Sequence, residues 1–240
     1  MTSATPLTAD QRVLVQAVTL ANAGSASERA FYRYVERGAE RMAARYLRDT
    51  YGSREVLHGP EASLDRLVAA LHTAANTPGV RAVDLLVNPH GTSRRLWFVD
   101  GPVDAIVVAD RIRARLDSSA RRRLRVVFST ACYGMSHSDA WLRSGFCVSV
   151  GARGIYADGL TSLPALLRAW AAGATVEQTV RTANGARMGR RQDAMAARYY
   201  RAVGRTQEAG AVDSERLVDG ARTMVVTSDP ATWHSGSLPS

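Results

Sequence analysis

The sequence predicts an α/β protein built on a mostly parallel β-sheet. Short apolar runs alternate along the 240 residues with amphipathic segments of helical period, which is the pattern of repeated βαβ units. The run at 82–87 is apolar except for Asp84, as expected for a parallel strand covered on both faces. Neither an internal repeat nor an interdomain linker is evident. We therefore expect a single domain over 1–240, with a loose tail over 229–240.

The first half of the chain alternates strands and helices. Residues 12–20 predict a strand, and Ser25 and Glu28 form a capping box that opens a helix extending to about residue 50. The expected buried face of this helix consists of Phe31, Val35, Met42 and Tyr46. The next expected elements are a short strand at 55–58, a helix from about Ser63, and the buried strand at 82–87.

The second half continues the same alternation. A small hairpin is expected from 96–99 and 106–108, followed by a helix at about 110–116 and a buried strand at 124–129. The elements expected after them are a helix near 138–143, a strand near 146–150, a helix through Leu163 and Trp170, a long basic helix at 176–203, and a final strand at 222–227.

Composition excludes several classes of protein. Apolar residues make up 46% of the chain and charged residues 22%, which is ordinary for a globular protein. No run approaches the roughly 18 apolar residues of a membrane helix, so we expect no membrane partner. The N-terminus lacks the basic start and strong apolar core of a secretory signal. Two cysteines without CxxC spacing predict neither a disulfide framework nor a metal site, and we expect a cytoplasmic protein.

The chain is strongly basic, with a net charge of +9, and all 31 basic residues are arginines. This charge permits an acidic partner, including nucleic acid, although a coding bias towards arginine explains it better. The late helix carries a basic stripe with two interleaved tyrosines, Tyr199 and Tyr200. Its arginines are Arg181, Arg187, Arg190, Arg191, Arg198, Arg201 and Arg205. A solvated face is the more frequent explanation for such a stripe, and nucleic-acid binding is the weaker alternative.

Two residues with complementary chemistry follow the two buried strands. His90 comes just after the strand at 82–87, and Cys132 comes just after the strand at 124–129. If these strands are neighbours, their carboxyl ends meet at one edge of the sheet and the two side chains face each other. An imidazole beside a thiol is the arrangement that nucleophilic catalysis requires.

The neighbours of this pair fit the same role. Gly91 lets a substrate approach the backbone, and its N–H together with that of Cys132 forms a candidate oxyanion hole. Because Cys132 lies shortly before an expected helix, and an imidazolium would lie beside it, we expect a lowered thiol pKa.

The segments VDLLVNPHGTSRRLWFVDG (83–101) and LRVVFSTACYG (124–134) resemble the caspase-like cysteine peptidases, and the legumain type in particular. About three quarters of the chain follows the layout of that family. The resemblance implies a three-layer αβα sandwich and a peptidase that needs no cofactor. It assigns His90 as the base and Cys132 as the nucleophile that forms an acyl-enzyme with a peptide substrate.

Further residues are candidates for contact with the substrate, one from the resemblance and the others from their positions near His90 and Cys132, although their chemistry conflicts. Asp158 lies where relatives shape the specificity pocket and would select a basic residue, unless it only forms an Asp-Gly turn. Arg94, with Arg95, would select acidic side chains instead, and His137 is a further candidate for substrate contact. Pro89 and Tyr133 depart from the family pattern. An inactive caspase-like scaffold or partner-binding module is therefore the alternative.

Overall fold

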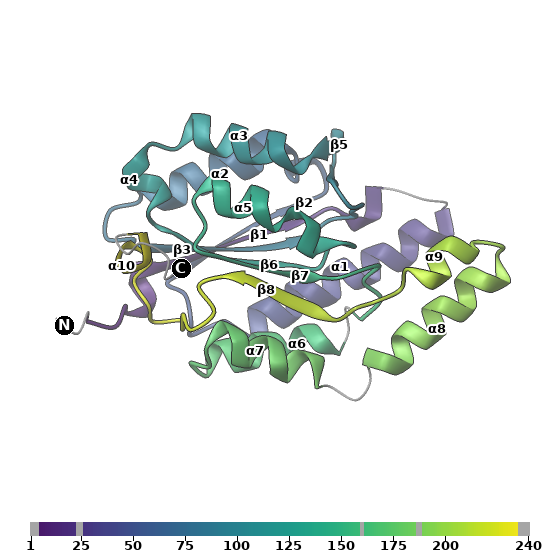
Figure 1. Cartoon of the computed structure of the whole chain (residues 1–240). Coiled ribbons are helices and arrows are strands. Elements are labelled where there is room, and N and C mark those ends of the chain that lie inside the picture. Colours follow the sequence, from purple (N-terminus) through teal and green to yellow (C-terminus); the bar gives the residue numbers. More distant parts are fainter. Residues whose placement is uncertain (1–4, 23–25, 159–160, 186–188, 235–240) are drawn as a thin grey trace.

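The computed structural model describes residues 5–22, 26–158, 161–185 and 189–234. Its centre is a six-stranded sheet in the order β2-β1-β3-β6-β7-β8, and a two-stranded hairpin of β4 and β5 lies apart from it (Figure 1). The strands of the sheet pair in parallel except β8, which is antiparallel to β7. The strands are β1 (Arg12–Val18), β2 (Ser53–His58), β3 (Ala82–Asn88), β4 (Arg95–Phe98), β5 (Gly101–Asp104), β6 (Leu124–Ser129), β7 (Val148–Ala152) and β8 (Arg216–Gly220).

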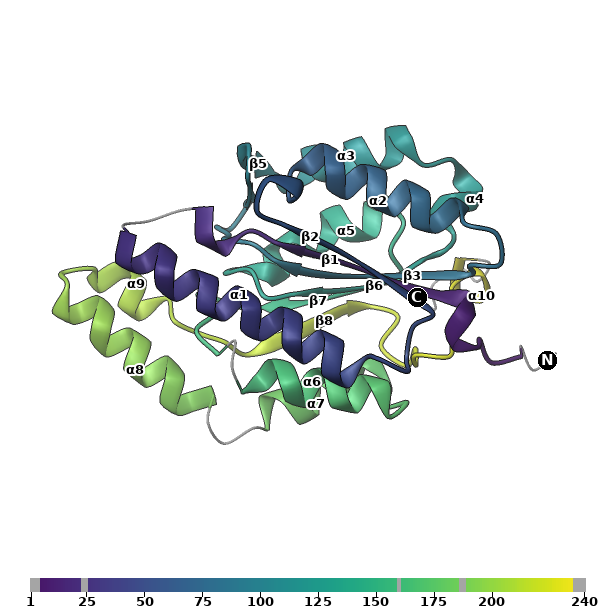
Figure 2. The same cartoon turned by 180° about the vertical axis from the view of Figure 1, so that it is seen from behind.

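Helices cover both faces of the sheet, so the predicted three-layer αβα architecture with a mostly parallel sheet is confirmed. Figures 1 and 2 show α2, α3 and α5 on one face and α1, α6 and α7 on the other. The α-helices are α1 (Ala26–Tyr46), α2 (Leu64–Asn76), α3 (Ala105–Arg115), α4 (Ser118–Arg121), α5 (Ser138–Ser144), α6 (Ser162–Ala171), α7 (Val176–Asn184), α8 (Gly189–Ala202), α9 (Thr206–Gly210) and α10 (Ala231–His234).

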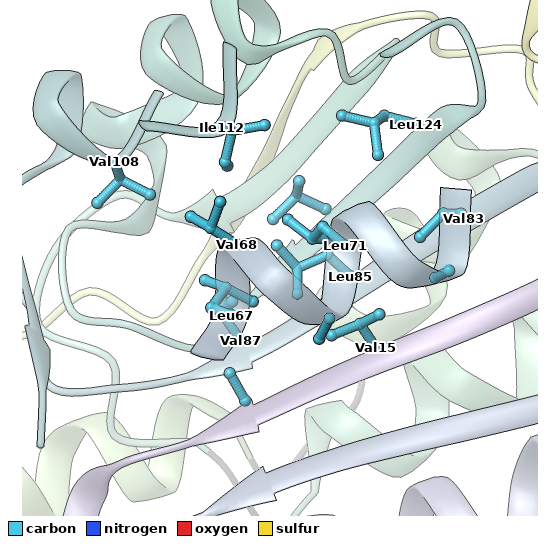
Figure 3. Close-up of a cluster of buried hydrophobic side chains, with 14 of the residues drawn as sticks. Val15, Leu67, Val68, Leu71, Val83, Leu85, Val87, Val108, Ile112 and Leu124 are labelled. Atoms are coloured by element: carbon cyan, nitrogen blue, oxygen red, sulfur yellow. The ribbon is translucent and has the colours of Figure 1, made fainter. Parts of the chain in front are cut away.

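Each central strand contributes side chains to two separate cores. Leu85 and Val87 of β3 face one core with Leu67 and Leu71 of α2 (Figure 3), whereas Leu86 packs into the opposite core. Successive residues of a strand point to opposite faces, so burial on both sides requires continuous apolar sequence. This is why the strands at 82–88 and 124–129 are recognisable from sequence alone.

The buried face of α1 agrees with the predicted one only in part. Met42 and Tyr46 are half-buried and pack against the core, as predicted, whereas Phe31 is 59% exposed. The centre of the buried face is formed by Ala39 and Ala43, whose small side chains let α1 approach the sheet closely but give a weak hydrophobic signal. Ser25 of the predicted capping box lies outside the described residues.

The hairpin prediction was wrong in its second strand. Residues 106–108 belong to α3, because Asp104 caps the helix by accepting a hydrogen bond from the backbone N–H of Ile106 at 3.1 Å. The partner of β4 is instead β5, in which Pro102 pairs opposite Trp97. The apolar run of 105–108 therefore belongs to a helix that turns Val108 and Ile112 towards α2.

Two predictions in the last third of the chain were also wrong. The long basic helix is divided into α7 and α8, and α7 ends at Asn184. Within the described ranges the last strand is β8, and residues 222–227 form no strand. Met224 and Val226 of that run are buried in the core from a non-strand segment, which accounts for their apolar character.

The first part of the predicted loose tail, residues 229–234, is ordered. Asp229 is buried and pairs with Arg81, and the short helix α10 follows it. Residues 235–240 lie outside the described residues.

A buried ion pair joins β3 to β6 near their amino ends. Asp84 and Arg125 are both fully buried, and the guanidinium donates to the two carboxylate oxygens at 2.8 and 2.7 Å. The hydroxyl of Tyr51 donates to the same carboxylate, and the indole N–H of Trp170 donates to that hydroxyl at 3.0 Å. Bidentate geometry and additional hydrogen bonds are the conditions under which a buried pair is tolerated.

Replacing one partner of this pair leaves the other charge buried and unpaired. We expect Asp84→Ala to lower the free energy of unfolding by about 3–5 kcal/mol, measured by urea denaturation. The double variant Asp84→Leu/Arg125→Met should recover most of that loss, because it removes both charges. A loss for the single variant below about 1 kcal/mol would contradict this assignment.

Candidate active site

The site begins with the pairing of β3 and β6. These strands are parallel neighbours, so their carboxyl ends lie at the same edge of the sheet. His90 and Cys132 follow them at this edge, as the sequence predicted. The backbones of the two loops touch: a Cβ atom added to Gly91 would lie 2.5 Å from the carbonyl oxygen of Cys132. Only glycine permits this approach.

A buried hydrogen bond joins the two strand ends just before the reactive residues. The side-chain amide of Asn88 donates to the hydroxyl oxygen of Thr130 at 2.7 Å, and the backbone N–H of Thr130 donates to the carbonyl of Val87 at 2.9 Å. Asn88 precedes His90 by two residues, and Thr130 precedes Cys132 by two. These contacts set the separation of the two loops.

A second link lies further along the same loops. Nε2 of His137 lies 2.7 Å from the carbonyl oxygen of Thr92, and the His137 side chain has no exposed surface. Burial lowers the pKa of this imidazole. His137 therefore joins the loop after Cys132 to the loop after His90 from within the protein.

The imidazole of His90 is oriented by the turn that follows β1. Its Nε2 lies 2.8 Å from the carbonyl oxygen of Leu20, within the 3₁₀ turn Leu20–Asn22. A carbonyl only accepts, so Nε2 carries the hydrogen and Nδ1 holds the free lone pair in the neutral ring. Burial lowers the pKa of His90, although the Leu20 carbonyl and the charge of Glu28 partly oppose this effect. The ring is thus a neutral base at neutral pH.

The thiol of Cys132 is half-buried, and the prediction of a lowered pKa was wrong. Burial raises the pKa of this thiol, and the backbone N–H groups of Tyr156 and of Cys132 itself oppose the rise only in part. The next α-helix along the chain, α5, begins only at Ser138, and a four-residue 3₁₀ turn precedes it. A helix dipole acts over the first turn only, so desolvation dominates here.

Tyr133, next to the cysteine, has a left-handed backbone with φ of 55°. Its N–H donates to the carbonyl of Gly154 at 2.7 Å, which fixes this conformation. The turn continues through Gly134, which lies against Gly151 at the end of β7. A non-glycine residue in this region costs about 1 kcal/mol or more, and such strain clusters at functional sites.

The two candidate specificity residues have different surroundings. Asp158 is 2% exposed, and its Oδ1 accepts hydrogen bonds from the backbone N–H groups of Thr161 and Ser162 at 3.3 Å each. It therefore stabilises the start of α6, and Gly159 of the predicted turn lies outside the described residues. Arg94 and Arg95 are exposed at the start of the β4–β5 hairpin.

Sequence analysis missed several neighbours of the reactive pair. The ring of Tyr32 packs edge-on against His90, with centroids 4.5 Å apart and planes at 84°. The charge of the Cys132 thiolate contributes to raised pKa values of Tyr32 and of Tyr200 in α8, although burial is the larger cause for both. Tyr32, in ring contact with His90, is thus a further member of the site. Only the helical periodicity of α1, had it been assigned to the correct face, could have indicated Tyr32.

The basic stripe divides between elements. Arg181 is exposed on α7, and Arg190, Arg191, Arg198 and Arg201 are exposed on α8. Arg205 precedes α9 and pairs with Glu208 at 2.9 Å. Arg187 lies outside the described residues. None of the helices in the described ranges is both long and apolar enough to cross a bilayer.

Comparison with known proteins gives structural neighbours only. No family model matches the chain, and no curated protein matches it. One similar solved structure is a secreted C11 cysteine protease from Bacteroides thetaiotaomicron, "iotapain", with a TM-score of 0.47 and 8% identity over 74% of this chain and 62% of that one. Another is a secreted C11 cysteine protease of that organism in complex with an irreversible peptide inhibitor. Its TM-score is 0.41, with 12% identity over 65% of this chain and 53% of that one.

The chain therefore spans less than two thirds of the length of these neighbours. At such low sequence identity and TM-score, structural similarity gives no information about activity. An activity can be inferred only from the residues of this chain.

The contact at Gly91 leads to a test of how the loops are spaced. Gly91→Ala should separate the loops and lower the free energy of unfolding by about 1–3 kcal/mol, measured by urea denaturation, because the added methyl meets backbone atoms. Gly210→Ala is the matched control, since no atom lies within 4 Å of its added Cβ. Equal stability of the two variants would show that the loops do not meet as described.

The raised pKa of Cys132 predicts how its reactivity depends on pH. At neutral pH the thiol is protonated, so the rate of alkylation by iodoacetamide should rise about tenfold per pH unit between about pH 6 and 8. Mass spectrometry of the labelled peptide measures this rate. Cys147 is the internal control, because burial raises its pKa to about 12 and should make it slower still. Rapid, pH-independent labelling of Cys132 near pH 6 would contradict the assignment.

Proposed function

We propose that this chain is a caspase-like cysteine peptidase of the legumain type, with Cys132 as nucleophile and His90 as general base. The observation that carries the proposal is the contact between the two loops at the carboxyl ends of neighbouring strands. The loop after β3 carries a neutral imidazole whose free nitrogen is Nδ1, and the adjoining loop after β6 carries the thiol.

The reaction begins with a protonated thiol and a neutral imidazole. As the sulfur attacks the peptide carbonyl, the thiol proton passes to Nδ1 of His90, and the C–S bond forms. Collapse of the tetrahedral intermediate breaks the C–N bond, and His90 returns the proton to the leaving amine. A water molecule then gives a proton to His90 and attacks the acyl-enzyme. This step releases the carboxylic acid and restores the thiol. The cycle needs no cofactor.

Backbone N–H groups are proposed to stabilise the oxyanion. Gly91 forms a bridge with Leu96, but the hydrogen bonds of that bridge use the N–H groups of Thr92 and Trp97. Among the described residues the N–H of Gly91 donates to no acceptor, so it is available to a substrate. The N–H of Cys132 is the second proposed donor.

The substrate preference is proposed in two opposite forms. Asp158 would favour a basic side chain if the segment after it opened to expose its carboxylate, and exposed Arg94 would favour an acidic one. His137 was also expected to contact substrate, but its burial gives it no surface in this conformation.

The test is cleavage of a diverse peptide pool, read by mass spectrometry. Cys132→Ala and His90→Ala should each reduce turnover by about 10³-fold or more, as expected when a nucleophile or its base is lost. Cys147→Ala is the matched control and should retain activity, since Cys147 Sγ instead lies 3.5 Å from the carbonyl oxygen of Leu124, at the amino end of β6. Equal cleavage by wild type and Cys132→Ala would remove Cys132 from the mechanism. The residues flanking the cleaved bond identify which of the two preferences holds.

The raised thiol pKa and the left-handed Tyr133 favour one alternative, an inactive caspase-like scaffold or partner-binding module. That alternative predicts no turnover by the wild-type protein at any pH from about 6 to 9, even where Cys132 can be alkylated. Turnover that is lost in Cys132→Ala would exclude it.

A further inference from the structure

One face of α1 touches the surroundings of His90 at two places. Tyr32 and Glu36 are one helical turn apart and therefore lie on the same side of α1. Tyr32 packs its ring against the imidazole of His90. Glu36 reaches the 3₁₀ turn Leu20–Asn22, whose Leu20 carbonyl lies 2.8 Å from Nε2 of His90.

Glu36 contacts the Leu20–Asn22 turn through a charge-assisted hydrogen bond. Oε1 of Glu36 accepts a hydrogen bond from the backbone N–H of Ala21 at 2.8 Å. The backbone N–H groups of Ala21 and Leu20 both lower the pKa of this half-buried carboxyl, although burial is the larger effect and raises it. The first N–H groups of a helical turn have no partner within the turn, so a carboxylate there is stabilising.

The position of the Leu20 carbonyl decides which nitrogen of His90 carries hydrogen. If the turn shifts, Nε2 loses its acceptor and the hydrogen is free to move to Nδ1, which would then be unable to accept a proton from a thiol. Glu36 contacts the turn that carries the Leu20 carbonyl, whereas Glu40, one helical turn further along α1, contacts a different residue. The Glu40 carboxylate contacts the exposed His58, with 3.3 Å between Oε1 and Nδ1, on another part of the surface.

We propose that Glu36 is a positioning residue for His90: its carboxylate holds the turn after β1, and the turn fixes the imidazole in the tautomer with hydrogen on Nε2. Tyr32 limits rotation of the ring from the same helix. The role of this tautomer in peptide hydrolysis rests on the proposed function, whereas the effect of Glu36 on the ring does not.

The experiment measures the tautomer directly. Nitrogen-15 NMR of the histidine ring distinguishes hydrogen on Nε2 from hydrogen on Nδ1, and a His90→Asn spectrum assigns the signals. In the wild type, Nε2–H should predominate. In Glu36→Ala, the ratio of Nε2–H to Nδ1–H should fall about five- to tenfold, which is the effect of losing one net hydrogen bond. Glu40→Ala is the matched control and should leave the ratio unchanged.

Two further measurements separate positioning from folding. Glu36→Gln keeps an acceptor for Ala21 and loses the charge, so its tautomer ratio should fall between those of the wild type and Glu36→Ala. Near-ultraviolet circular dichroism checks that both variants are folded, and Glu36→Gln decides the question if Glu36→Ala is not. A folded Glu36 variant with the wild-type ratio, or an equal change in Glu40→Ala, would overturn the proposal.

Peptide cleavage gives the last comparison. If the proposed function holds, Glu36→Ala should lower kcat about tenfold with little change in KM, because Glu36 acts on the His90 tautomer through the Leu20–Asn22 turn. If the wild type cleaves no peptide, the proposed function fails, and the tautomer ratio still decides the role of Glu36.

Discussion

Strands β3 and β6 are joined by buried polar side chains at both ends, and the arrangement of the site depends on this double connection. Near the amino ends, Asp84 pairs with Arg125 inside the protein. At the carboxyl ends, Asn88 donates to Thr130. The backbone ladder and the alternation of buried side chains already favour one register of these strands. The directional polar contacts reinforce that register and the separation between the loops of His90 and Cys132.

Burial determines the chemical state in which the pair rests. Desolvation disfavours the charged form of each group, so it raises the pKa of the thiol and lowers that of the imidazole. Both shifts favour a neutral pair over a thiolate–imidazolium pair. Under the proposed function, the thiol would therefore be activated only during attack on a carbonyl, when the imidazole receives its proton. Its resting form is less exposed to oxidation or alkylation, because the thiolate is the species that reacts.

The sequence predicted the central strands well because strands buried on both faces are apolar at most positions. It predicted the place of His90 and Cys132 for the same reason, since both follow such strands directly. Local signals failed where tertiary contacts decide the outcome. Ala39 and Ala43 carry too little hydrophobicity to reveal the buried face of α1. Met224 and Val226 are buried without being in a strand, so their apolar character misled the assignment.

The surroundings of the reactive residues were less predictable than their positions. The carbonyl of Leu20 contacts His90 across 70 residues of sequence, and a backbone group leaves no trace in residue identity. The raised pKa of Cys132 depends on how much protein covers it, which no spacing reveals. The pairing of Asp84 with Arg125 was likewise invisible, although a lone carboxylate in an apolar strand signals that some partner is needed.

The link between Asn88 and Thr130 divides the two loops evenly. His90 and Cys132 each lie two residues beyond the hydrogen-bonded residue of their own loop. The hydrogen bond between Asn88 and Thr130 therefore sets the separation at which both loops start, whereas the orientation of the His90 ring also depends on its contact with α1. The few buried polar atoms behind the two loops are therefore less free to vary over evolutionary time than the surface of this protein.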